Sequence, residues 1–164
     1  MPNWCSNHFT ISHSDPSLLE KMIQASIAER LGETFAPIPD SVHDDSCDWC
    51  ISNCGTKWDF GCTDIGCTDI SNLGDDIYSG YFDTAWAPPV EWYHIMSNLG
   101  FKIEAYWHEG GNCFAGSLVD GELTEYNNID CDSVKDLPQE FDELFAVNEQ
   151  YRPEEEGFDS EDIA

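Results

Sequence analysis

The chain has 164 residues, and its 33 Asp and Glu residues against 6 Lys and Arg residues give a formal net charge of −27. This charge repels the phosphates of nucleic acids and anionic membranes and attracts basic surfaces, so we expect no direct contact with nucleic acid or membrane. Hydrophobic residues make up 41% of the sequence, enough to fill the core of one ordinary domain. The sequence contains no apolar run of membrane-spanning length and no signal-peptide pattern, which predicts a cytoplasmic protein.

In chain order, the first strand is expected at 4–12, where polar and apolar residues alternate. A helix should begin at Ser14–Pro16 and end at Gly32, and a second should run from Pro88 to Gly100, because proline is tolerated at a helix start and glycine favours a helix end. The apolar stripes of these helices need a sheet to cover. The remaining strands are predicted at 55–60, 80–86, 101–108, 113–119 and 122–126.

This order, β-α-β-β-α-β followed by a hairpin strand, predicts an α+β fold of the ferredoxin-like, split βαβ kind, an antiparallel sheet with two helices on one face. The expected domain spans 1–126 and carries Cys-bearing loop insertions at 40–54 and 61–79. Residues 127–152 form an acidic extension with helical periodicity, and 153–164 are predicted to be a disordered acidic tail.

Negative charge is concentrated after residue 119, because residues 120–164 hold 16 Asp and Glu residues against 2 Lys and Arg residues. Acids at such density can pair with the Arg and Lys of a basic partner and speed the encounter. We expect the partner to contact Asp120, Glu122, Glu125, Asp130, Asp132, Asp136, Glu140, Asp142 and Glu143, together with Asp44, Asp45 and Asp48. Trp92, Trp107 and Tyr126 are the candidate aromatic anchors of that contact.

Eight cysteines in a reducing compartment indicate free thiols or metal ligands rather than disulfides. The spacing of one group fits tetrahedral zinc, which needs four soft ligands. Its members are Cys47, Cys50, Cys54, Cys62 and Cys67, the last two lying in a tandem Gly-Cys-Thr-Asp-Ile repeat at 61–70. The alternative is that these are packed or surface thiols with no metal, and no other cofactor is expected.

A thiol nucleophile with a base could be drawn from either of two Cys-His pairs, Cys5 with His8 or Cys113 with His108. Cys5 and His8 would face opposite sides of a strand. We therefore predict a binding protein rather than an enzyme.

Trp4, Trp58 and Trp86 fall in three expected strands, where core packing is the simplest role for each ring. Lys57 and Asp59 flank Trp58, and a structural ion pair between them is expected ahead of a ligand contact.

Several motifs resemble the YubB ferredoxin-like domain family: Met-Pro-Asn-Trp-Cys-Ser-Asn at 1–7, Gly-Thr-Lys-Trp-Asp at 55–59, Phe-Asp-Thr-Ala-Trp-Ala-Pro-Pro at 82–89 and His-Glu-Gly-Gly at 108–111. The resemblance covers about residues 1–120. It implies the same ferredoxin-like fold and an origin on phages, plasmids or their bacterial hosts, with no established activity. Members usually carry aromatic residues near positions 50 and 54, so the cysteines there depart from the family pattern.

Charge and resemblance together suggest an anti-defence inhibitor, anti-restriction or anti-CRISPR, that imitates nucleic acid and blocks the basic DNA- or RNA-binding surface of a host immune complex. It would act in the host cytoplasm as a monomer or small homo-oligomer. The alternative is a small binding module of unknown partner, with zinc or without, whose acidity serves solubility only.

Overall fold

The protein is an α+β fold in a computed structural model that describes residues 3–42, 46–62, 66–68 and 76–152. The expected tail at 153–164 and the sites at Asp44 and Asp45 lie outside these residues. The strands are β1 (Trp4–Ser12), β2 (Gly66–Thr68), β3 (Ile77–Ala85), β4 (Lys102–Glu109), β5 (Phe114–Val119) and β6 (Glu122–Asn127). The helices are α1 (Pro16–Ile27), α2 (Leu31–Phe35), α3 (Ser46–Cys54), α4 (Val90–Asn98), the 3-10 turn η1 (Ser133–Asp136), α5 (Gln139–Phe145) and α6 (Val147–Gln150).

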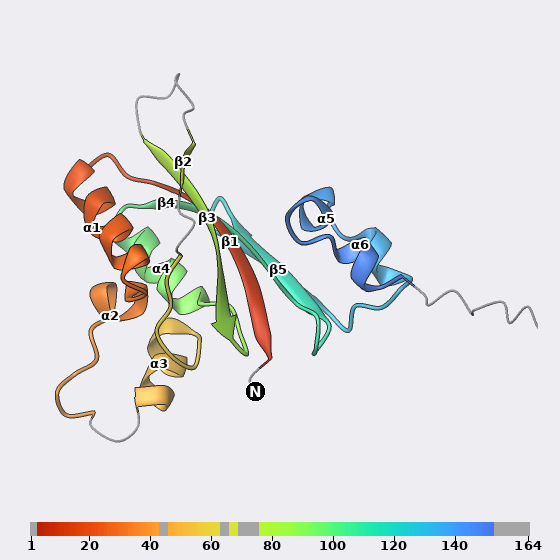
Figure 1. The fold of residues 1–164 in the computed structure, drawn as a ribbon, viewed down its shortest axis with the longest axis horizontal. Helices are drawn as coiled ribbons and strands as arrows, with labels where there is room; N and C mark the ends of the chain where they lie inside the picture. The colour runs from red at the N-terminus through yellow and green to blue at the C-terminus, as the bar shows by residue number, and fades with distance from the viewer. Residues whose placement is uncertain (1–2, 43–45, 63–65, 69–75, 153–164) are drawn as a thin grey trace, which may run out of the picture.

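The strands form one antiparallel sheet in the order β2-β3-β1-β4-β5-β6, with β1 at its centre between β3 and β4. Helices α1 to α4 lie on one side of this sheet, and α5 and α6 lie on the other (Figure 1). We call these sides the helix face and the outer face. In the described part of the chain, no helix combines the length and the apolar character that crossing a membrane requires.

The two predicted helices are present as α1 and α4, but the predicted end of the first at Gly32 is wrong: α1 ends at Ile27, and Gly32 lies within the separate helix α2. Local chemistry accounts for the start of α1 and the end of α4. Asp15 caps α1 by accepting hydrogen bonds from the backbone N–H and the hydroxyl of Ser17, which holds the pKa of its carboxyl below the ordinary value. After α4, Gly100 adopts a left-handed φ of 94°, and the Phe101 N–H reaches back to the Met96 carbonyl. This 6→1 bond is the Schellman arrangement that glycine favours.

The main core lies on the helix face, between helices α1 to α4 and the strand residues that point toward them. Alternation along β1 sends Phe9 and Ile11 into this core, and Trp92 of α4 is fully buried there. The Trp92 indole N–H donates to the Leu31 carbonyl at 3.0 Å, so the ring's polar atom is satisfied inside an apolar environment. This bond also holds α2 against α4.

A second, smaller core lies on the outer face, beneath the C-terminal helices. Phe141 and Val147 are buried there together with Ala115, Ile129 and Val134. Residues 127–152, for which helical periodicity is predicted, contain the short helices η1, α5 and α6 rather than one continuous helix. The division between α5 and α6 falls at Ala146, whose φ of 51° is left-handed and ends α5.

Three sequence expectations about the segments between the main elements differ from the structure. Residues 55–60 are not a strand, because their polar groups bond to the helices and to the end of β3: the Thr56 hydroxyl donates to the Ala85 carbonyl, and the Leu31 N–H donates to the Phe60 carbonyl. Part of the expected loop at 40–54 is instead the helix α3. The expected insertion at 61–79 contains β2 and the beginning of β3.

Candidate functional site

The predicted acidic residues of the C-terminal region lie on folded elements. Along the β5–β6 hairpin, η1 and α5, the side chains of Asp120, Glu122, Glu125, Asp130, Asp132, Asp136, Glu140 and Glu143 are exposed, and Asp142 is half-buried. We call these nine residues the acidic surface. Only Lys135 and Arg152 carry positive charge among residues 120–152, and the exposed Lys135 lies 3.7 Å from Asp132. Asp48 is exposed on α3.

Two members of the acidic surface also hold its backbone in place. Asp130 accepts hydrogen bonds from the backbone N–H groups of Asp132 and Ser133 at the start of η1, and these bonds lower the pKa of its carboxyl. Asp142 accepts from the Asn148 N–H at 2.9 Å, across the break between α5 and α6. These carboxylates fix the turns that present their neighbours.

The expectation that Trp92 and Trp107 anchor a partner is wrong, because both side chains are fully buried in the main core. Trp107 shares the inward side of β4 with Ile103 and Ala105, and it packs in a stacked arrangement with Tyr93 of α4. The alternation of exposed and buried residues along β4 could have predicted that Trp107 is buried. Tyr126 is half-buried against Phe141, with ring centroids 5.6 Å apart, so it belongs to the outer-face core.

The prediction that Trp4, Trp58 and Trp86 pack in the core is also wrong. Their side chains are 50%, 39% and 47% exposed. Trp4 meets Trp58 edge to face at 6.2 Å, and the Lys57 ammonium lies 4.1 Å from the centre of the Trp86 ring and 5.1 Å from that of Trp58. Lys57 therefore pairs with indole faces, an arrangement that cation–π attraction favours.

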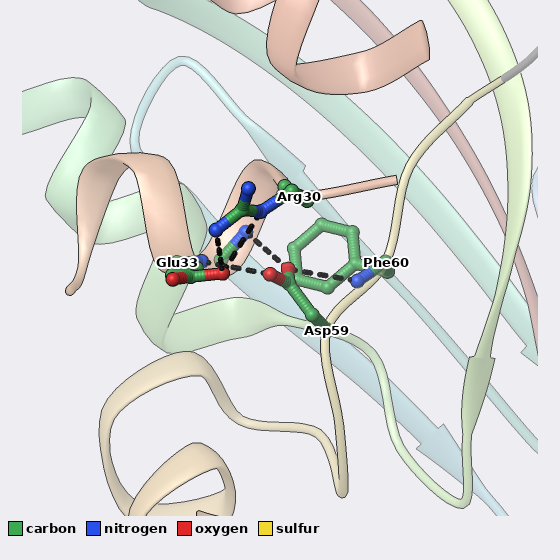
Figure 2. Close-up of polar contacts among 5 residues, drawn as sticks. Arg30, Glu33, Asp59 and Phe60 are labelled. Atoms are coloured by element: carbon green, nitrogen blue, oxygen red, sulfur yellow. Dashed lines mark hydrogen bonds and ion pairs between the residues drawn. The ribbon is translucent and has the colours of Figure 1, made fainter. Parts of the chain in front are cut away.

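Asp59 does not act as the expected ion-pair partner of Lys57, because its oxygens are taken by backbone donors. Oδ1 accepts from the N–H groups of Gly32 and Phe60, and Oδ2 accepts from that of Glu33. Figure 2 shows this carboxylate at the first turn of α2, beside the ion pair in which Arg30 contacts Glu33 at 2.6 Å. Asp59 thus caps α2 from a distant part of the chain.

A groove with a volume of about 980 Å³ opens on the outer face, between the loop that carries Trp58 and helix α5. Its strand residues are in register, since Ser6 of β1 pairs with Asp83 of β3 on one side and with His108 of β4 on the other. Trp4, Trp58, Tyr81, Asp83, His108 and Glu143 line it, and we call these six residues and the space between them the aromatic groove. Sequence analysis missed this site, although the alternation of β1 and β3 marks its strand residues.

The candidate zinc ligands do not converge among the described residues, where no group of three His, Cys, Asp or Glu side chains has metal-binding geometry. Cys47 is exposed, Cys50 and Cys54 are buried on α3, and the side chain of Cys67 lies outside the described set. Cys62 is fully buried, and its thiol donates to the Tyr81 carbonyl. Burial raises the pKa of the Cys54 thiol to about 12.

The two Cys-His pairs have different surroundings. Cys5 is buried in the main core, where desolvation raises its pKa, whereas His8 lies on the outer face against Tyr81 at 4.5 Å. They occupy opposite sides of β1, as strand alternation predicts. His108 is hydrogen-bonded through Nε2 to the Tyr151 hydroxyl at 3.2 Å, and the Cys113 thiol is directed to the Gly110 carbonyl at 3.5 Å.

Comparison with protein-family models, with curated proteins and with solved structures returned no match for this chain.

Proposed function

We propose that the protein is an acidic inhibitor of a bacterial defence complex, and that its acidic surface occupies the basic groove that would otherwise hold DNA or RNA. The observation that carries the proposal is the placement of nine carboxylates on folded elements, three on the β5–β6 hairpin of the sheet and six on the segment after β6 that packs on it, with two basic residues in the same stretch. Charges held in fixed positions can oppose fixed Arg and Lys side chains, whereas a flexible acidic tail would first lose conformational entropy.

The remaining parts of the proposal are fold and origin. The order β2-β3-β1-β4, with α1 and α4 on the helix face, supports a ferredoxin-like split βαβ unit extended by β5 and β6. The resemblance to the YubB ferredoxin-like domain family supports a phage- or plasmid-borne gene product. On this proposal the protein is no enzyme, needs no cofactor and acts in the host cytoplasm, where it meets a basic protein.

The test is competition for DNA. A purified restriction enzyme or CRISPR effector is bound to a labelled duplex, and the full chain is added at ~0.1 M and ~0.5 M salt. We expect displacement of the duplex at the lower salt and weaker displacement at the higher. Neutralising four acids, by Glu122→Gln, Glu125→Gln, Asp136→Asn and Glu140→Gln, should slow association about tenfold.

The matched control changes the same net charge elsewhere, with Glu20→Gln, Asp40→Asn, Asp76→Asn and Glu91→Gln, all exposed positions outside the acidic surface. We expect this variant to compete nearly as well as the unaltered chain. Equal losses in the two variants would mean that only total charge matters, and failure to displace the duplex from any of a panel of such complexes would contradict the proposal.

A further inference from the structure

The outer face is covered over only part of its width. The C-terminal helices α5 and α6 lie over one part of the sheet (Figure 1), and they pack on Tyr106, Ala115 and Tyr126 of β4, β5 and β6. Among the described residues, no hydrophobic cluster places them on the outward residues of β1 and β3. Tyr81 is 47% exposed and Asp83 is also exposed. The aromatic groove follows the boundary between the covered and the uncovered parts.

Large rings line this groove without being buried by it. Trp4, Trp58 and Tyr81 each leave more than a third of the side chain accessible. Exposed aromatic groups gathered in a concave surface mark a place where another molecule binds, because burying them releases water from a large apolar area. The ligand must therefore present a flat or apolar surface to the rings.

The polar lining selects the charge of that ligand. Carboxylates of Glu29, Asp83 and Glu143 line the groove in addition to Asp59, and none of its described lining residues is a Lys or Arg. Asp59 is already satisfied by backbone donors, whereas Asp83 accepts a hydrogen bond from the Ser6 hydroxyl at 2.9 Å and Glu143 accepts one from the Gln139 side-chain amide at 2.6 Å. Each of these two carboxylates has a second oxygen, and carboxylates in a groove that aromatic rings also line attract a cation.

The chain itself shows that its indole faces accept cations, because Lys57 lies over Trp86 and Trp58 just outside the groove. Arginine fits rings and carboxylates together better than lysine does. Its planar guanidinium stacks on an aromatic face while its N–H groups donate to oxygens in the same plane.

We propose that the aromatic groove binds an arginine-bearing extended segment of a basic protein, with guanidinium groups against Trp4, Trp58 and Tyr81 and with Asp83 and Glu143 accepting their hydrogen bonds. The inference rests on the proposed function, since it identifies a second contact for the same basic partner. Aromatic side chains on a sheet also stack on unpaired bases, but a chain of charge −27 repels the phosphates that would accompany them.

The probe is a peptide of alternating Gly and Arg with four arginines, titrated into the ¹⁵N-labelled full chain while the six tryptophan indole N–H signals are followed by NMR. We expect the signals of Trp4 and Trp58 to shift in a saturable way. Those of Trp92 and Trp107, buried in the main core, should stay in place. A matched peptide with neutral citrulline for arginine should bind at least about fivefold more weakly.

Variants identify the rings. Tyr81→Ala should weaken the arginine peptide about fivefold, and the control Leu123→Ala, at an exposed apolar residue of β6 outside the groove, should leave its affinity unchanged. Equal binding of the citrulline peptide, or shifts confined to other tryptophans, would overturn the inference. A single-stranded oligonucleotide that shifts Trp4 and Trp58 where the peptide does not would overturn it as well.

The competition assay separates this inference from the proposed function. If Trp4→Ala with Tyr81→Ala displaces duplex as well as the unaltered chain does, the groove is not a partner contact and the inference fails while the inhibitor proposal stands. If the unaltered chain displaces no duplex yet binds the arginine peptide in the groove, the inhibitor proposal fails and the groove remains a site for basic segments.

Discussion

The two faces of the sheet carry hydrophobic cores of different size. On the helix face, α1, α2 and α4 enclose a core that includes Phe9, Trp92 and Trp107 and draws on every long element of the first 109 residues. On the outer face, Phe141 and Val147 lie at the centre of a cluster supplied mostly by residues after 112. Six of the nine residues of the acidic surface lie on the segment after β6, so we expect that the packing of this segment can be weakened while the main sheet persists.

The largest effect is expected from Trp92→Ala on the helix face. The variant loses a fully buried ring and its hydrogen bond to Leu31, so the free energy of unfolding should fall by about 4–5 kcal/mol. Chemical denaturation followed by circular dichroism measures it. Trp86→Ala, at a half-exposed ring, should cost about 1 kcal/mol or less, and similar losses for both would contradict the burial seen here.

On the outer face, Phe141→Ala should cost about 3 kcal/mol, because the ring is fully buried but its cluster is small. The loss of protection from hydrogen exchange should be confined to the C-terminal elements. Hydrogen exchange is expected to speed up in β6, α5 and α6 and to stay slow in β1 and β3. Phe141→Leu should retain most protection, and uniform loss across the sheet in the alanine variant would show that the two faces unfold as one unit.

A smaller effect is expected from Asp59→Ala, which removes the side-chain cap of α2. Three backbone N–H groups lose their acceptor, so the free energy of unfolding should fall by about 1–2 kcal/mol. Thermal unfolding compares it with Asp83→Ala, an exposed carboxylate of the aromatic groove, which should change stability by less than about 0.5 kcal/mol. The opposite ranking would mean that Asp59 is not the cap.

The smallest effect concerns pH and His108, which lies beside Glu109 and contacts Tyr151 of the C-terminal region. Desolvation lowers the pKa of His108, with the Glu109 charge opposing it in part. The unfolded chain therefore takes up a proton near pH 6.5 that the folded chain resists, and stability declines as pH falls below about 6.5.

His108→Gln should reduce this decline, as measured by denaturation between pH 7.5 and pH 5. Burial also lowers the pKa of His8, so part of the decline will persist in the variant. His94→Gln, at an exposed position of α4, is the control and should leave the pH dependence unchanged. A steeper decline in His108→Gln would contradict the assignment.

Sequence patterns located most of the regular elements because the signals are local. Asp15 defines a helix start through its side-chain cap, Pro16 and Gly100 mark helix ends through their backbone preferences, and alternation in β1 separates inward from outward residues. Trp92 belongs to the apolar stripe of α4, and Trp107 falls on the inward side in the alternation along β4, so both patterns predict burial. The prediction that these two rings are surface anchors disregarded those patterns.

Other features could not be obtained from local patterns. The sequence predicts a strand at 55–60, but partners from distant parts of the chain take the hydrogen bonds of these residues. The Asp59 carboxylate caps α2, and the Phe60 carbonyl accepts from the Leu31 N–H. Just after this segment, the Cys62 N–H donates to the Ser26 hydroxyl. Neither the aromatic groove nor the exposure of Trp4 could be predicted, because alternation assigns a residue to a side of a strand without saying what covers that side.

The sequence by itself determined the net charge of −27, its concentration after residue 119, the α+β class and two of the helix-face helices, α1 and α4, since each depends on composition or on residues close in the chain. Only the tertiary structure decided that residues 127–152 pack against the outer face, that this packing stops short of β1 and β3, and that Trp4, Trp58 and Tyr81 meet carboxylates there. Those outcomes depend on contacts between residues far apart in the chain.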